Sequence, residues 1–252
     1  MQWPWTRRGH TRESGEPTGG VSSFHLWWGD QPAEPVTEVL VTCEVVQAPT
    51  ASRLYFWAVQ ADFVDASGRS HGAAHGGFQW NPSFPPNYTA LNWGGYSNAS
   101  DVTSILTGTE SPLPSTPNDP NTRDYPWIVG RPYRFRIHKG ARGWAFDVVD
   151  TVTGLSTTVR ELLVGGDRLR AVVVWSEVFC RCDHESAIAR WSDFEYRTAS
   201  GASVRPRTAT TNFPAFSAGD CTNTDIRTDG AGAVVMLTNA ERTIAPGVTI
   251  EL

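Results

Sequence analysis

The chain has 252 residues, of which 40% are hydrophobic and 19% are charged, and its formal net charge is −5. This length and composition fit one large all-β domain or two small ones and exclude global disorder. There is no long basic run, so we expect no nucleic-acid partner. No apolar stretch approaches the roughly 18 residues that span a bilayer, so we expect no membrane partner.

The first 20 residues are polar and contain glycine and proline, which is typical of a flexible lead-in. They have no apolar segment of the kind that a secretory signal contains. Two interpretations of location stay open. The protein is secreted if a signal was removed, and cytoplasmic if Met1 is native.

Short runs of β-branched and aromatic residues, separated by turn residues, dominate the rest of the chain. The predicted strands are Val36–Val46, Arg53–Phe63, Gly77–Trp80, Thr89–Trp93, Tyr133–His138, Trp144–Asp150, Ser156–Leu163, Arg170–Phe179, Ala187–Tyr196 and Ala233–Leu237. This spacing is typical of a two-sheet antiparallel sandwich.

Alternation along the strand Arg53–Phe63 separates a buried face from an open one. The face expected in the core carries Tyr55, Trp57, Val59, Ala61 and Phe63. The opposite face carries Gln60 and Asp62 beside Phe56, and we expect it to be a wet surface that can bind a ligand.

The segment His71–Gly77 has two histidines four residues apart, but its glycines disfavour the helix that would bring them together on a metal. We expect a hairpin loop here. The alternative is that His75 acts as a general base or binds a sugar.

Amide and aromatic side chains gather in the next twenty or so residues. Amides both donate and accept hydrogen bonds, so they can bind hydroxyl groups. The candidate ligand contacts are Gln79, Asn81, Asn92, Trp93 and Tyr96.

The segment Ser97–Trp127 contains several proline and asparagine residues and no predicted strand. A loop of this length in a compact domain is either functional or mobile. Arg123, near its end, either binds an acidic group of a ligand or fixes the loop through Asp124.

The strand Arg170–Phe179 has a carboxylate within an apolar run. Alternation puts Glu177 on the same face as Trp175, away from the core. A carboxylate beside an aromatic ring can hold a sugar, because the ring gives apolar contact and the carboxylate accepts hydroxyl hydrogen bonds. The alternative is an ion pair of Glu177 with Arg168 or Arg170 on a solvated face.

Four cysteines, Cys43, Cys180, Cys182 and Cys221, permit two disulfides. Cys180 and Cys182 are too close in one strand to bridge each other, so we expect one of them to bridge to Cys221. Four free thiols are the alternative.

The cluster that follows this strand offers Asp183 and Glu185 as oxygen ligands. With loop carbonyls they would hold Ca²⁺, and the C-x-C spacing is only a weak signal for zinc. The alternative is a polar loop beside a disulfide.

Three segments resemble the concanavalin A-like lectin and glucanase superfamily: RPYRFRIH, then GWAFDVVD, and the late strand AIARWSDFEY. The segment GGFQWNP, followed by NWGGY, looks like an uncharacterised bacterial family of such sandwiches. The resemblance covers about residues 24–197. It implies a jelly roll that binds or cleaves glycans, often with a structural calcium.

Two catalytic patterns of this superfamily are missing from the chain. It lacks the E-x-D-x-E strand of laminarinase-type glucanases, and the R-x-E-L-R and Q-I-H strands of alginate lyases. The resemblance therefore implies neither of those mechanisms, because a fold alone does not define a function.

The sequence thus predicts an all-β fold, a concanavalin A-like two-sheet antiparallel sandwich with a C-terminal β extension. We expect a flexible segment over residues 1–20, the sandwich over 21–198, and a linker with the extension packed on the sandwich over 199–252.

The predicted function is carbohydrate recognition on the open face that carries Glu177 and Trp175. The rival is an enzyme, either a small-molecule cyclase or isomerase with Glu177 as acid and base, or a glycan hydrolase or lyase with Asp62 as second carboxylate. A structural module is the third option. Apart from calcium we expect no cofactor, since no nucleotide-binding fingerprint occurs.

Overall fold

The computed structural model describes residues 17, 20–98, 101, 103–115, 119–213 and 220–252. The expectation of a flexible segment over residues 1–20 falls almost entirely outside them. The strands are β1 (Ser22–Trp28), β2 (Val36–Gln47), β3 (Tyr55–Val64), β4 (Ser70–Trp80), β5 (Thr89–Tyr96), β6 (Thr122–Asp124), β7 (Pro132–Lys139), β8 (Trp144–Asp150), β9 (Ser156–Leu162), β10 (Arg168–Val178), β11 (Ile188–Thr198), β12 (Ser203–Val204), β13 (Thr208–Asn212), β14 (Thr224–Thr228), β15 (Val234–Thr238) and β16 (Thr249–Glu251). The described residues contain no helical segment with the length and hydrophobicity of a transmembrane span.

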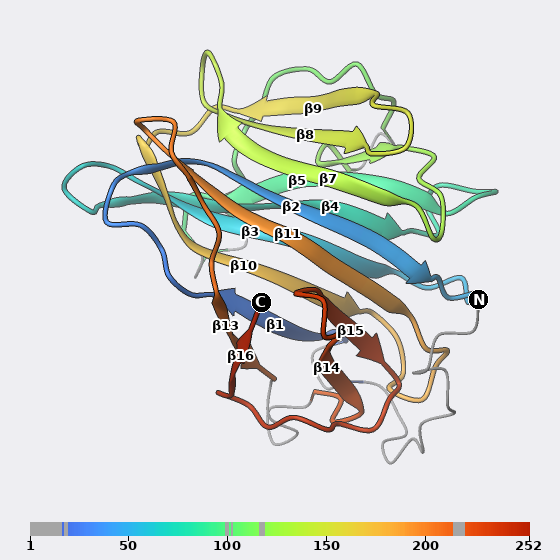
Figure 1. The fold of residues 1–252 in the computed structure, drawn as a ribbon. Coiled ribbons are helices and arrows are strands. Elements are labelled where there is room, and N and C mark those ends of the chain that lie inside the picture. Colours follow the sequence, from blue (N-terminus) through green and yellow to red (C-terminus); the bar gives the residue numbers. More distant parts are fainter. Residues whose placement is uncertain (1–16, 18–19, 99–100, 102, 116–118, 214–219) are drawn as a thin grey trace.

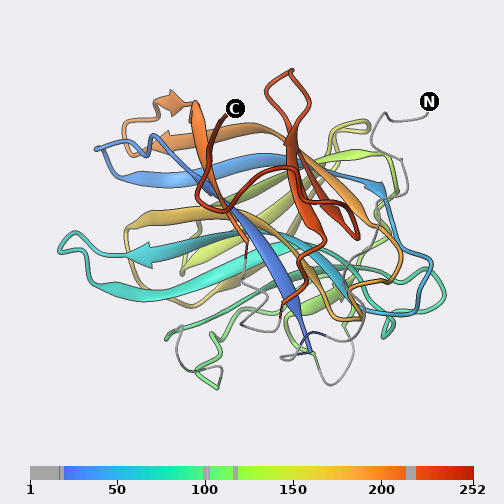
Figure 2. The ribbon, with the colours of Figure 1, turned by 90° about the horizontal axis from the view of Figure 1, so that it is seen from below.

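The strands pair into two antiparallel layers (Figures 1 and 2). One layer, here the groove sheet, runs β16–β13–β1–β10–β3–β4–β5–β6. The other, the ladder sheet, runs β14–β15–β11–β2–β7–β8–β9. They are joined by one pair of residues, Leu169 near the start of β10 and Val36 at the start of β2. This arrangement confirms the predicted all-β sandwich.

Aromatic rings fill the space between the two sheets. Phe78 of the groove sheet meets Phe135 of the ladder sheet with ring centroids 4.8 Å apart. Trp93 likewise lies 5.2 Å from Phe146 and is fully buried. This placement corrects the expectation that Trp93 contacts a ligand, because alternation along β5 puts it on the core side.

The segment His71–Gly77 is strand, not the expected hairpin loop. A Cβ at Gly76 would lie 2.8 Å from the Phe146 ring of the opposite sheet. Glycine is therefore required here by close approach of the two layers, and not by a turn.

The C-terminal residues extend both sheets. β13 pairs with β1 of the groove sheet, and β15 pairs with β11 of the ladder sheet. A disulfide joins Cys182 to Cys221, which is one of the two predicted pairings. Cys43 and Cys180 are buried and take no part in this disulfide.

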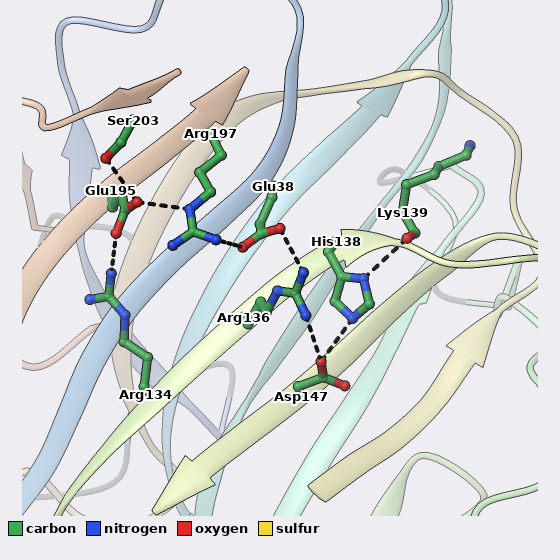
Figure 3. A network of polar contacts seen from close by, with 9 residues as sticks. All are labelled: Glu38, Arg134, Arg136, His138, Lys139, Asp147, Glu195, Arg197 and Ser203. Atoms are coloured by element: carbon green, nitrogen blue, oxygen red, sulfur yellow. Dashed lines mark hydrogen bonds and ion pairs between the residues drawn. The ribbon is translucent and has the colours of Figure 1, made fainter. Parts of the chain in front are cut away.

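The outer face of the ladder sheet carries alternating charges (Figure 3). This polar ladder runs through Glu195, Arg197, Glu38, Arg136, Asp147 and His138, with contacts of 2.8 to 3.3 Å. Its charges are largely paired within the sheet, which leaves few of them available to a ligand on this layer.

Candidate active-site groove

A cavity of about 700 Å³ opens on the face of the groove sheet that points away from the core. It brings together seven of the predicted site residues: Gln60, His75, Gln79, Asn92, Tyr96, Trp175 and Glu177. Among the other residues that line it, His25, Phe56, Asp119 and Asn121 were not predicted as site residues.

Strand register arranges these side chains in rows across the sheet. Glu177 of β10 lies opposite Phe56 of β3, which lies opposite Gln79 of β4. In the second row Trp175 is followed, two strands on, by Gly77 and then Asn92. Successive rows on one face are about 7 Å apart. Because Phe56 lies between them in the first row, Glu177 and Gln79 flank its ring.

The Glu177 carboxyl group is partly exposed to the groove but largely removed from solvent. Burial, and after it the negative charge of Asp220, raises its pKa to about 7. The Glu177 side chain forms no hydrogen bond or ion pair with the described residues, and Arg168 instead pairs with Asp167 at 3.0 Å. The expected alternative, a surface ion pair, is not found. A carboxyl group with this pKa can both accept and donate a proton at neutral pH.

Asp220 belongs to the C-terminal extension, and its charge acts on Glu177. The backbone N–H of the next residue, Cys221, donates to Ser22 Oγ at 3.1 Å. Ser22 belongs to β1, the neighbour of β10, so this contact holds Asp220 near Glu177. No sequence pattern links residues so far apart, which is why Asp220 was not predicted.

Trp175 does not offer an open ring face. It is 5% exposed and packs against Phe56 at 4.8 Å and His75 at 5.4 Å. This corrects the expectation of a stacking platform for a sugar. Burial lowers the pKa of His75 and of His25 to about 4, so both imidazoles are neutral at pH 7.

The amide of Gln79 has a fixed orientation. The backbone N–H of Ser83 donates to Asn81 Oδ1 at 2.9 Å, so Asn81 Nδ2 must face the other way. Asn81 Nδ2 then donates to Gln79 Oε1 at 2.8 Å. Gln79 Nε2, for which the described residues supply no acceptor, is left for the groove. Asn81 itself does not line the groove but orients Gln79, in place of the expected ligand contact.

Asn92 is held in a similar way. Its Nδ2 donates to Thr122 Oγ1 at 3.1 Å, and its Oδ1 is buried with no partner in the described part of the chain. Unpaired buried acceptors are rare, so this oxygen is suited to receive a donor from a ligand or a water molecule.

Besides Trp93 and Asn81, two more predicted residues, Asp62 and Arg123, do not line the groove. Asp62 is six positions from Phe56 along β3, which places it roughly 20 Å from the row of Glu177. A glycosidase needs two carboxyl groups within about 10 Å, so Asp62 cannot be the partner carboxylate. Arg123 pairs with Leu91 on the core side of β6 and donates to the Thr122 carbonyl oxygen at 2.9 Å.

The two predicted calcium ligands have protein partners. Arg181 donates to both oxygens of Asp183, at 3.0 and 3.1 Å. The Glu185 carboxylate accepts hydrogen bonds from the Thr50 hydroxyl and from the backbone N–H groups of Thr50 and Ala51. Within the described ranges no three His, Cys, Asp or Glu side chains form a metal-binding group. Calcium stays a prediction from the sequence.

No protein-family model and no curated protein matches the sequence. Among solved structures, Scytalido-glutamic peptidase with a peptide-based transition-state analogue is similar over 90% of this chain and 98% of that chain, with 11% identity and a TM-score of 0.47. SCP-B, a member of the eqolisin family of peptidases in complex with the tripeptide Ala-Ile-His, covers the same shares at 10% identity and a TM-score of 0.44. At these scores the likeness defines neither a family nor a reaction for this chain. The concanavalin A-like superfamily also stays a prediction.

Proposed function

We propose that this protein is a hydrolase that cleaves acyl bonds in extended substrates, with peptides as the substrate class. The observation that supports this best is Glu177, a carboxyl group with a pKa near 7 that faces a groove without a cationic partner among the described residues. Such a group is suited to proton transfer more than to passive ligand binding.

The proposed reaction uses Glu177 and Gln79 together. Ionised Glu177 removes a proton from a water molecule as that water attacks the substrate carbonyl carbon. The oxygen that becomes negative accepts a hydrogen bond from Gln79 Nε2. Protonated Glu177 then gives its proton to the leaving nitrogen, which breaks the C–N bond and restores the carboxylate.

The shape of the groove favours an extended substrate over a small enclosed one. Its walls come from β1, β10, β3, β4 and β5. Along β4 the lining runs from Ala73 to Gln79, which spans about 20 Å, the length of some six residues of extended peptide. A cyclase or isomerase of a small molecule would instead need a closed pocket.

Glycan hydrolysis is the second candidate, and Asp220 favours it. Two carboxyl groups are needed for that reaction, and the charge of Asp220 acts on Glu177. Carbohydrate binding without turnover has less support, because the Trp175 ring is buried.

The test measures cleavage of pooled, internally quenched peptides between pH 4 and pH 9. We expect Glu177→Gln to lower kcat/KM by about 10²–10⁴-fold, the usual contribution of a general acid–base group. In the wild type, kcat/KM should fall as the pH drops through 7, because the base becomes protonated. The matched control is Asp62→Asn, which removes a carboxylate on the same face but outside the groove and should leave kcat/KM unchanged.

Other outcomes select the rivals. A Glu177→Gln variant that still cleaves the peptides contradicts the proposal. Cleavage of a polysaccharide panel that is lost in both Glu177→Gln and Asp220→Asn would assign glycan hydrolysis. If the protein binds glycans without turnover, and Glu177→Gln only weakens that binding, the result would support carbohydrate recognition.

A further inference from the structure

A buried arginine connects the ladder sheet to the far end of the groove. Arg160 of β9 is 6% exposed and forms no ion pair with a described carboxylate. Its Nε and Nη2 donate to the Trp93 carbonyl oxygen at 3.3 and 3.0 Å, and Nη2 also donates to Asn121 Oδ1. Burial lowers the pKa of Arg160 to about 10, and the charge of Arg123 adds to this. The guanidinium nevertheless stays a cation at neutral pH, fully able to donate.

This contact fixes the direction of the Asn121 amide. A guanidinium group only donates, so the oxygen of Asn121 must face Arg160 and its Nδ2 must face away. The Asn121 backbone is held as well, because its N–H donates to Asp119 Oδ1 at 3.1 Å and its carbonyl accepts from the Trp93 N–H at 3.0 Å. The described residues provide no acceptor for Nδ2, and Asn121 lines the groove.

Gly94 makes room for this arrangement. A Cβ at Gly94 would lie 2.6 Å from Asn121 Cγ and 3.0 Å from its Nδ2, so only glycine lets the amide lie on the sheet. Gly94 pairs with His75 of β4, which places the Asn121 amide in the row of His75. That row is four residues along β4 from Gln79, or about 13 Å.

We infer that Asn121 Nδ2 forms a second binding subsite, which donates to a backbone carbonyl of the peptide about four residues from the reacting bond. Arg160 and Gly94 are its positioning residues, and the inference takes the substrate class from the proposed function. A peptide with fewer than four residues on that side of the reacting bond cannot reach Asn121.

The test uses two internally quenched peptide pools, one of tetrapeptides and one of octapeptides. Asn121→Asp keeps an oxygen for Arg160 but loses the donor, and Gly94→Ala displaces the amide without changing charge. We expect both variants to raise KM about tenfold for octapeptides with kcat unchanged, as the loss of one hydrogen bond implies. Tetrapeptide cleavage should not change. The matched control is Asn87→Asp, an exposed turn residue outside the groove.

The subsite would be overturned if kcat/KM fell equally for tetrapeptides and octapeptides. It would also be overturned if only kcat fell, or if neither variant changed octapeptide cleavage. If the wild type cleaves neither pool, the proposed function has failed and binding decides the subsite. The readout is then the NMR signal of the Asn121 side-chain amide, assigned by its absence in Asn121→Asp. A shift on adding the octapeptide pool upholds the subsite, and an unchanged signal overturns it.

Discussion

At the scale of single residues, Glu177 shows how a fold can favour reactivity over stability. Burial and the charge of Asp220 disfavour its ionised form, so its pKa rises from 4.5 to about 7. The folded state therefore binds the proton more tightly than the unfolded state does. The contribution of protonated Glu177 to the stability of the folded state is fully present below pH 4.5 and is lost as the pH rises through 7.

This linkage predicts that Glu177→Gln stabilises the protein at high pH. Glutamine resembles the protonated carboxyl group but never ionises. We expect the variant to exceed the wild type by about 3 kcal/mol in free energy of unfolding at pH 8, the equivalent of the pKa shift. The advantage should disappear near pH 4. Urea unfolding at pH 4, 6 and 8 measures it, and an advantage independent of pH would contradict the burial of an ionisable Glu177.

At the scale of strands, alternation could be predicted and register could not. Period-2 patterns correctly separated the faces of β3 and β10, and so put Glu177 and Trp175 together. Which strands are neighbours depends on long-range pairing, which no local pattern contains. The opposition of Phe56 to Glu177, and the contact of Arg160 with Asn121, were therefore invisible in the sequence. The glycines of β4 led to the wrong prediction of a hairpin loop, because glycine is used both in turns and where two sheets pack closely.

Within the ladder sheet, the polar ladder predicts a pH-dependent stability that can be separated from that of Glu177. His138 Nε2 lies 2.9 Å from Asp147 Oδ2, and this hydrogen bond is the main cause that raises the pKa of His138 above 6.5 (Figure 3). The contribution is fully present below pH 6.5 and is lost as the pH rises through the folded-state pKa.

We therefore expect His138→Gln to be less stable than the wild type at pH 6, by about 1 kcal/mol or less for such a partly exposed pair. The difference should shrink by pH 9. Thermal unfolding of both proteins across this range measures it. A gap that widens with pH would show that the neutral imidazole is the stabilising form.

At the scale of the whole molecule, the C-terminal extension completes both the fold and the site. It adds strands to both sheets, and the disulfide fastens the end of β10 to the start of β14. The segment that bears Asp220 is thus tied down beside the groove. A two-residue spacing of cysteines predicted such a bridge, but only the structure assigns Cys182 to it.

The contribution of the Cys182–Cys221 disulfide to stability can be predicted from the length of the loop that it closes. The two cysteines are 39 residues apart, and cross-linking a loop of that length constrains the unfolded chain. We expect the double variant Cys182→Ala/Cys221→Ala to lose about 2–4 kcal/mol in free energy of unfolding. Urea unfolding of the oxidised wild type and the variant measures the loss. Equal midpoints would mean that the extension is held by strand pairing alone.

The most direct test is an NMR titration of Glu177 itself. The side-chain carboxyl carbons of glutamate are labelled with ¹³C, and the signal missing from Glu177→Gln identifies the residue. We predict a midpoint near pH 7, which would establish a carboxyl group able to transfer protons in the groove. A midpoint near 4.5 would mean an ordinary solvated carboxylate, and would contradict the proposed hydrolase.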